Sequence, residues 1–246
     1  MTKNDEIITE LKKYYNSLKS DSDNFINLFG PVTFPISIDD GVTREIYRWY
    51  VWNESEKEMS FEDLLESIKK MGSSKNYDSL LVYGDFENAE NPLVRVHSCC
   101  FTGDVVFSTR CDCGQQLKTS FELITKNGSG AVAYLANQEG RGIGLFAKAI
   151  THKVQDNLGL DSYKSCTVLG IEDEIRKYEG LGTLFNYFRG DKGICVLSNN
   201  PEKLNGLIEN GIKVKDICPL NGFENEDNKK VLNQKKMRAK EFKINL

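Results

Sequence analysis

The sequence predicts an α/β fold, a mixed sheet with covering helices, that also carries an N-terminal α+β extension. From about residue 81 onward, short apolar strand-like runs alternate with helical patterns. The first 80 residues follow a different order, a helix, a hairpin and a second helix. With 246 residues, 39% of them hydrophobic, the chain can bury a sizeable core. We therefore expect residues 1–80 to pack as an extension on a core domain of residues 81–246.

The extension is expected to contain three elements. Apolar residues between Ile7 and Leu18 recur at helical spacing and predict an amphipathic helix. Turn signals at Gly30-Pro31 and Asp40-Gly41, followed by the aromatic and β-branched run 46–52, predict a hairpin. Apolar residues at helical spacing within the charged segment 53–76 predict the second helix.

The core domain is expected to alternate strands with helices. Strands are predicted at residues 79–83, 93–97, 130–135, 194–197 and 212–214. Helices are predicted at residues 115–126, from about 145 to 158, at 181–188, and after Asn199-Asn200-Pro201. This order favours a sheet covered by helices.

Composition excludes several classes of partner. The net charge of −4 and the pI near 5.4 argue against broad binding of nucleic acid, which usually requires a basic domain. The one basic run, from Lys229 to Lys240, is expected to be a solvated helix face and receives no function. No apolar stretch approaches the ~20 residues that span a bilayer, and the N-terminus lacks a secretory signal. We therefore expect a cytoplasmic protein without a membrane partner, whose seven cysteines stay reduced.

Three of these cysteines, Cys100, Cys111 and Cys113, form a pattern that suits a metal ion. They offer three thiolates and have no obvious fourth ligand nearby in the sequence. A structural zinc site normally has four protein ligands, whereas a catalytic one has three and leaves a position for water or substrate. The alternative is packing, because free cysteine is among the most buried residue types.

A glycine-rich segment, Gln138 to Gly144, is neither a dinucleotide fingerprint nor a phosphate loop. Its glycines would let the backbone approach a ligand closely. Glu139 can accept hydrogen bonds from an amino group, and Arg141 can bind phosphate with two donors. An ordinary strand-to-helix turn explains the segment equally well when it is taken alone.

Together, the cysteine run, Gln138 to Gly144 and Leu197 to Lys203 closely resemble the three signature segments of the GTP cyclohydrolase II family. The resemblance runs from about Tyr83 to the C-terminus and includes residues 225–237, which resemble the closing helix of the family. The first 80 or so residues match poorly, and we interpret the chain as a divergent, monofunctional member. Residues 81–246 would then be the catalytic domain.

Membership would imply a zinc- and magnesium-dependent homodimer that opens the imidazole ring of GTP. Formate and pyrophosphate leave in this reaction, the first committed step of riboflavin synthesis, and a diaminopyrimidine nucleotide remains. By resemblance, Cys100, Cys111 and Cys113 hold a Zn²⁺ ion that activates water to attack C8 of guanine. Mg²⁺ accompanies the nucleotide phosphates.

The resemblance also implies roles for residues around the nucleotide. Gln116 and Glu139 match positions near guanine, and Arg95, Gly140 and Arg141 match positions close to the nucleotide. Ser198 and Lys203 match the hydroxyl and the lysine at the phosphates, and Ser162 stands where the family has threonine. Cys99 and His97, which precede the first ligand, are left out of the metal shell. Two roles remain open for His97, that of orienting groups near the metal and that of a structural histidine.

In the family, pyrophosphate release is attributed to an arginine that is activated by a carboxylate, which stands two residues before it in the sequence. These positions match Arg176 and Glu174, where the family has aspartate. A covalent step through Arg176 and electrostatic stabilisation of the departing phosphate are both open, since a guanidinium holds its proton tightly.

One departure from the family pattern affects the chemistry. His152 stands where the family has a tyrosine implicated in ring opening, and the match also weakens between Asp161 and Gly170. A histidine could replace the phenol, or hydrolysis could stop at the formylated intermediate. Two competing hypotheses therefore remain. One is a paralogue that acts partway, or on another purine nucleotide in a different pathway, and the other is a non-enzymatic binding module stabilised by zinc.

Overall fold

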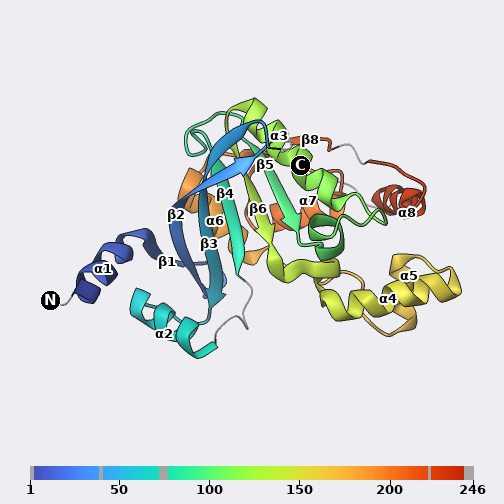
Figure 1. The fold of residues 1–246 in the computed structure, drawn as a ribbon, viewed down its shortest axis with the longest axis horizontal. Helices are drawn as coiled ribbons and strands as arrows, with labels where there is room; N and C mark the ends of the chain where they lie inside the picture. Colours follow the sequence, from blue (N-terminus) through green and yellow to red (C-terminus); the bar gives the residue numbers. More distant parts are fainter. Residues whose placement is uncertain (1–2, 39–40, 72–76, 221–222, 241–246) are drawn as a thin grey trace.

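The computed structural model describes residues 3–38, 41–71, 77–220 and 223–240 of the chain. Within these ranges the strands form one mixed sheet of eight strands in the order β1-β2-β3-β4-β6-β5-β7-β8 (Figure 1). The strands are β1 (Tyr15–Lys19), β2 (Phe25–Ser37), β3 (Arg44–Ser55), β4 (Asp78–Tyr83), β5 (Leu93–Ser98), β6 (Gly130–Leu135), β7 (Ile194–Leu197) and β8 (Val214–Cys218). The predicted mixed α/β sheet is confirmed.

The sheet changes character along its width. From β1 through β4 to β6 each neighbouring pair is antiparallel, whereas β5 is parallel to both β6 and β7, and β7 is parallel to β8. Parallel strands end at the same edge of a sheet, and ligands in α/β proteins bind outside that edge. The arrangement therefore brings together the residues that follow β5, β6 and β7.

Helices cover both faces of the sheet. The helices are α1 (Lys3–Leu11), α2 (Phe61–Met71), α3 (Cys113–Asn127), α4 (Gly144–Leu158), α5 (Ser162–Val168), α6 (Glu179–Arg189), α7 (Pro201–Glu209) and α8 (Lys229–Ala239). Shorter helical segments are η1 (Lys12–Tyr14), η3 (Phe101–Val105) and η4 (Ala136–Gly142). Figure 1 shows α3 on one side of the sheet and α6 and α7 on the other.

The core follows from the two-residue period of the strands. In β6, Ala131 and Ala133 face a cluster that includes Leu181 and Leu184 of α6 and residues of α7. Val132 faces a second cluster, which includes Ile124 of α3. Both faces of β6 are thus buried, as is usual where helices cover both faces of a parallel sheet.

The first helix is shorter than the sequence predicts. It ends at Leu11, and Tyr15 and Leu18, which we expected on the same helix, lie instead in β1. There Leu18 pairs with Ile26 of β2, and the Tyr15 hydroxyl donates to Asn27 Oδ1 (2.8 Å) and to the Met59 carbonyl (2.7 Å). Helical spacing did not separate the two possibilities, and contacts distant in sequence favour the strand.

The predicted hairpin and second helix are confirmed as β2, β3 and α2. Gly30-Pro31, however, marks a register shift inside β2 and not the turn between the strands. Asp40, from the other turn signal, lies outside the described residues. Residue 80, where we divided the extension from the core, lies inside β4, and the division stays a prediction.

Most expected core elements are present within a few residues of their predicted bounds. The last strand, β8, begins at Val214, where the predicted strand ends, and α5 was not predicted. Among the described residues, no helix combines the length and the apolar character needed to cross a membrane.

Candidate active site

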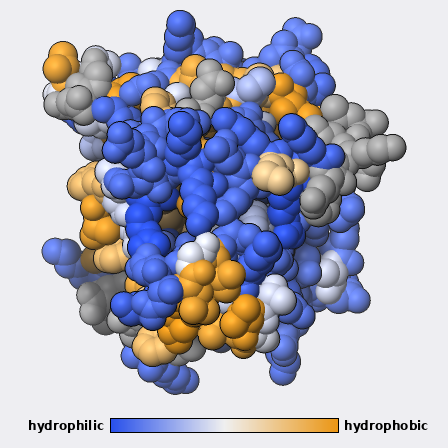
Figure 2. Space-filling view, turned by 90° about the vertical axis from the view of Figure 1, so that its right-hand side faces the viewer, coloured by the Kyte–Doolittle hydropathy of each residue, from blue (hydrophilic) through white to orange (hydrophobic). Residues whose placement is uncertain are grey.

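A cavity of about 1040 Å³ lies at the carboxyl edge of the parallel strands. Its walls come from the residues that follow β5 and β7, from η4 after β6, and from α3, α4, α5 and α8. Figure 2 faces the side of the molecule that carries α4, α5 and α8, and hydrophilic residues cover much of its centre. The predicted site residues that line this cavity are Arg95, Cys100, Cys111, Cys113, Gln116, Glu139, Gly140, Arg141, His152, Ser162, Arg176, Ser198 and Lys203.

The three predicted metal ligands lie together. Their Sγ atoms are all within 4.8 Å of one another, and Cys100 Sγ is 3.7 Å from Cys111 Sγ. Cys100 follows β5, and Cys111 and Cys113 lie at the start of α3. Gly103 of η3 makes room for the sulfur atoms, because a Cβ there would be 2.8 Å from Cys111 Sγ and 3.3 Å from Cys100 Sγ. Within the part of the chain that the structure describes, no fourth ligand joins the group.

This cluster fits a tetrahedral zinc ion. A Zn–S distance of ~2.3 Å in tetrahedral geometry places two sulfur atoms ~3.8 Å apart. Hydrogen bonds from Cys111 and Cys113 lower the pKa of the Cys100 thiol, and the hydrogen bond to Cys100 raises the pKa of Cys111 and Cys113. Ionisation of Cys100 is therefore favoured at the expense of Cys111 and Cys113, and a cation among the three sulfur atoms would remove the penalty on the other two.

Lys148 of α4 connects the thiols to Glu139, and sequence reasoning missed it. Its Nζ donates to Cys100 Sγ (3.2 Å), Thr102 Oγ1 (2.9 Å) and Glu139 Oε1 (2.7 Å). The second carboxylate oxygen of the buried Glu139 accepts from the Phe101 amide at 2.5 Å. Lys148 precedes His152 by one helical turn, a spacing that could have placed it on the same face.

His152 lies half-buried in α4 on the wall of the cavity. Burial lowers the pKa of its imidazole, and the positive charges of Arg110 and Lys148 lower it further. The ring is therefore mainly neutral near pH 7 and can accept a proton.

His97 is buried, and its Nε2 lies 3.0 Å from Asp104 Oδ2. Asp104 also accepts from the Cys100 amide (2.9 Å) and from the Tyr134 hydroxyl (3.1 Å). These contacts hold the loop that presents Cys100, which is compatible with both roles left open for His97.

Arg95 and Gln116 form a chain of hydrogen bonds that includes an unpredicted carboxylate. Arg95 donates to Gln116 Oε1 (2.8 Å) and to the Leu197 carbonyl (3.0 Å). Gln116 Nε2 in turn donates to the buried Asp112 at 2.5 Å. Burial lowers the pKa of Arg95.

Lys203 is a buried cation with neutral partners. Its Nζ donates to the Val96 carbonyl (2.9 Å) and to Ser98 Oγ (3.4 Å). Burial lowers its pKa well below the usual value, and the charges of Arg176 and Arg95 add to this effect. Because desolvated cations repel one another, this end of the cavity favours an anion.

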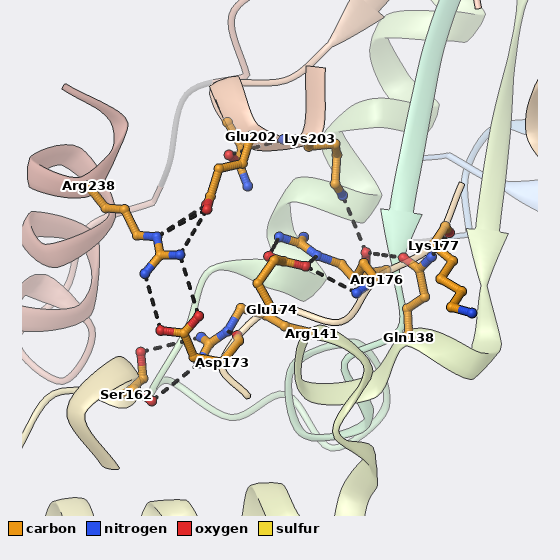
Figure 3. A network of polar contacts seen from close by, with 12 residues as sticks. Gln138, Arg141, Ser162, Asp173, Glu174, Arg176, Lys177, Glu202, Lys203 and Arg238 are labelled. Atoms are coloured by element: carbon orange, nitrogen blue, oxygen red, sulfur yellow. Dashed lines mark hydrogen bonds and ion pairs between the residues drawn. The ribbon is translucent and has the colours of Figure 1, made fainter. Parts of the chain in front are cut away.

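Arg176 is the third cation at this end, and Glu174 pairs with it from outside the cavity wall. Arg176 Nε donates to Glu174 Oε1 at 2.6 Å (Figure 3). Burial is the largest single influence and opposes the charge of the guanidinium, but the hydrogen bond with Glu174 and the charges of Glu174 and the neighbouring tyrosines together raise the pKa of Arg176. The predicted pair is therefore formed, and its arginine stays protonated.

The glycine-rich segment forms the turn η4. Gly140 and Arg141 have positive φ values of 61° and 65°. The Arg141 guanidinium lies 4.4 Å from the centre of the Tyr163 ring and donates to the Asp173 carbonyl (2.5 Å) and to Ser162 Oγ (3.4 Å). The structure thus brings Ser162 and Arg141 together.

Ser198 lies in the turn that begins α7. It is buried, and its Oγ accepts from the Asn200 amide at 3.1 Å. Asn200 caps the helix by accepting from the Lys203 amide, and Pro201 occupies the first turn, as the sequence predicts.

The basic helix α8 also reaches the cavity, although the sequence analysis gave this run no function. The α8 residues with cationic side chains on the cavity wall are Lys230, Lys235, Lys236 and Arg238. Charge alone did not indicate this position, because a solvated helix has the same composition.

Comparisons with known proteins agree with this geometry. A protein-family model for GTP cyclohydrolase II matches residues 65–219. A "GTP cyclohydrolase-2" of Psychromonas ingrahamii is 38% identical over 175 residues, which are 71% of this chain and 86% of that protein. A "Riboflavin biosynthesis protein RibBA" of Endomicrobium trichonymphae is 39% identical over 176 residues, which are 72% of this chain. The match spans about two fifths of that longer relative, 41% of its length.

Proposed function

This chain belongs to the GTP cyclohydrolase II family, and we propose that it opens the imidazole ring of GTP by hydrolysis, releasing formate and pyrophosphate, in riboflavin biosynthesis. One observation carries the proposal. The same cavity is lined by three clustered thiols, which we call the thiol end, and by the buried cations Arg95 and Lys203, which we call the cation end. A nucleotide whose base and phosphates differ in chemistry suits both groups of residues at once.

The thiol end supplies the hydrolytic centre. Cys100, Cys111 and Cys113 would hold Zn²⁺ and leave a fourth position open. Bound there, zinc supplies a Lewis acid that makes water nucleophilic near neutral pH. The Lys148 ammonium, 3.2 Å from Cys100 Sγ, offsets part of the negative charge of three thiolates. His152, neutral near pH 7, can accept a proton as the ring opens.

Recognition of guanine is assigned to Glu139 and Gln116. A carboxylate suits the amino edge of the base, and an amide suits its carbonyl edge. Both side chains hold partners in the free protein, Lys148 for Glu139 and Arg95 for Gln116, so their positions are set before the base arrives. A site built to satisfy these groups leaves them unpaired with the wrong base, which is how it would reject adenine.

The cation end would bind the phosphates, with Arg176 at the departing pyrophosphate. Burial is outweighed by the hydrogen bond with Glu174 together with the charges of Glu174 and the neighbouring tyrosines, so the pKa of Arg176 is raised and its guanidinium keeps its proton. This favours electrostatic stabilisation over attack by the arginine on phosphorus. Mg²⁺ would accompany the phosphates.

A second candidate function rests on His152. It lines the cavity where the family has tyrosine, and a neutral imidazole differs from a phenol in both acidity and reach. A protein that releases pyrophosphate but stops at the formylated intermediate, or that serves another pathway, is therefore the alternative.

Product analysis with and without the histidine separates these functions. The zinc-loaded protein is incubated with GTP and Mg²⁺, and formate, pyrophosphate and the pyrimidine product are quantified together with those of His152→Tyr. We expect equal amounts of formate and pyrophosphate from the native protein. The matched control is Lys153→Gln, an exposed neighbour on α4 outside the cavity wall, which should behave as the native protein.

Each of the other possible outcomes would support a different function. Pyrophosphate without formate from the native protein, with formate restored by His152→Tyr, would establish the alternative. Turnover of another purine nucleotide in place of GTP would change the substrate. No turnover, together with unfolding on metal removal, would favour the zinc-stabilised binding module. The expected homodimer stays a prediction, which light scattering of the same preparation checks.

A further inference from the structure

We propose that the basic face of α8 forms an outer phosphate subsite, which binds the terminal phosphates of a nucleoside triphosphate. The inference deepens the proposed function and rests on it in one respect, that the inner phosphate lies at Arg176 and Lys203. Four observations support it: the charge of α8, the contacts of Arg238, those of Lys235, and the charge left over at the inner cations.

The charge of α8 has one sign and is concentrated on the cavity. Its sequence, KKVLNQKKMRA, contains five cations and no acidic residue, in a chain whose net charge is −4. Four of the five, Lys230, Lys235, Lys236 and Arg238, line the cavity, whereas Lys229 is not among its lining residues. The cavity wall also carries acidic residues, among them Asp112, Glu202 and Glu224, so it is the part of the wall formed by α8 that has one sign of charge and favours an anionic ligand.

Arg238 joins α8 to the inner cations. Its Nη2 donates to Glu202 Oε1 (2.9 Å), and its Nη1 lies 3.3 Å from Asp173 Oδ2 (Figure 3). Its guanidinium also lies 4.2 Å from the centre of the Tyr163 ring. Glu202 directly precedes Lys203 and Asp173 directly precedes Glu174, so Arg238 is held beside the residues assigned to the inner phosphate.

Lys235 approaches from the other side. Its Nζ is 3.2 Å from Asp112 Oδ1. Asp112 also accepts a hydrogen bond from Gln116, and Gln116 accepts one from Arg95. The C-terminal half of α8 is therefore held by two contacts, Lys235 with Asp112 and Arg238 with Glu202. Lys236, whose side chain is 67% exposed, lies between these two anchors in the sequence and lines the cavity, and its Nζ is 3.6 Å from Glu224 Oε2.

The inner cations alone do not balance a triphosphate. Arg95, Arg176 and Lys203 carry at most three positive charges, because burial lowers the pKa of Lys203, and the Glu174 carboxylate paired with Arg176 offsets one of them. A nucleoside triphosphate carries more negative charge than the remaining two. The α8 cations line the same cavity, where the ion pairs of Lys236 and Arg238 with carboxylates would be exchanged for charge-assisted hydrogen bonds to phosphate oxygens.

Binding of inorganic tripolyphosphate tests the subsite without any ring chemistry. Calorimetry on the zinc-loaded protein compares two double variants. The first combines Lys236→Gln and Arg238→Gln, and the charge-matched control combines Lys229→Gln and Lys213→Gln. We expect the Kd for tripolyphosphate to rise about tenfold in the former and to stay within about twofold in the latter. Orthophosphate, measured by displacing tripolyphosphate, should bind both variants within about twofold of the native protein, because it fills the inner position alone.

Equal weakening in both double variants, no weakening in either, or no binding to the native protein would overturn the subsite. If loss of Arg238 prevents folding, as its melting curve would reveal, Lys236→Gln alone serves, with about a threefold rise expected. The outcomes stay separable from those of the proposed function. If the protein opens the ring of GTP but the Kd for tripolyphosphate does not rise tenfold in the α8 variant, only the subsite is ruled out. If the Kd rises but the ring is not opened, only the proposed reaction is ruled out.

Discussion

The two ends of the cavity differ in how their charges are satisfied. At the thiol end, Lys148 pairs with Glu139 at 2.7 Å and donates to Cys100, so polar groups find partners within the protein. At the cation end, Lys203 donates only to neutral oxygens among the described residues, although it is buried. Burial of a cation without a counterion is unfavourable.

This difference shows that each end lacks a bound ion or ligand of the opposite charge. Ionised Cys100 opposes the ionisation of Cys111 and Cys113 until a metal cation joins them, whereas Arg95 and Lys203 repel each other until an anion arrives. The cavity thus has one group of residues that suits a cation and one that suits an anion. Substitutions that act on one end and spare the other test this comparison.

The largest effect is expected at the thiol end. Cys111→Ser should lower bound zinc from about one ion per chain to nearly none and ring opening by about a thousandfold or more, because it removes one of three thiolate ligands. Atomic absorption gives the metal content. The matched control is Cys218→Ser in β8, outside the thiol cluster, which should keep its zinc. The comparison breaks if the Cys111 variant keeps zinc, or if it loses tripolyphosphate binding along with the metal.

A somewhat smaller effect, on the rate of pyrophosphate release, is expected at the cation end. Arg176→Ala should slow pyrophosphate release about 100- to 1000-fold while zinc content stays unchanged, because one charge-stabilising donor at the departing phosphate is lost. Pyrophosphate and formate are assayed separately. Arg176→Lys, which keeps the charge but not the paired donors to Glu174, should recover part of the rate. Near-normal release by the alanine variant would exclude both the covalent and the electrostatic role.

The smallest effect concerns η4, the turn that both ends share. Asp78 accepts from the Asn137 amide in η4, and burial raises its pKa to about 6. Because this value lies above the unfolded one of 3.8, the folded protein holds the proton more tightly. The stability that it provides is complete below the unfolded pKa and is lost as the pH rises through about 6.

Urea unfolding of the native protein and of Asp78→Asn at two pH values measures this contribution. Between about pH 5 and pH 7.5, the native protein should lose about 1 kcal/mol of unfolding free energy relative to the variant. A constant difference across that range would show that Asp78 titrates normally. A change in zinc content or in tripolyphosphate binding would show that η4 holds the ends in place more strongly than its contacts indicate.

The two ends also differ in how far the sequence predicts them. Cys100, Cys111 and Cys113 lie within one short stretch, so their spacing alone indicated a metal site. Ser198 and Lys203 received a role only through the family resemblance, because nothing local shows that β7 ends beside β5. Arg238 received none, since its position depends on contacts with Glu202 and Asp173, far away in the chain.

Local patterns failed for the same reason at the N-terminus. The residues from Ile7 to Leu18 fit a helical period throughout, yet Tyr15 and Leu18 form strand β1. Pairing with β2 decides between the two conformations, and that pairing is a property of the folded chain. Elements with a single dominant signal, such as α3 with Gly128 after its last residue, were predicted within a few residues.

The antiparallel half of the sheet has a consequence for how proteins of this kind change over evolutionary time. Strands β1 to β4 contribute to the core, but among the described residues they place no side chain on the cavity wall. A substitution there alters packing without touching the cavity, whereas one at the carboxyl edge of β5, β6 or β7 also alters the chemistry of its wall. We therefore expect relatives to differ more in the first half of this continuous sheet than in the second.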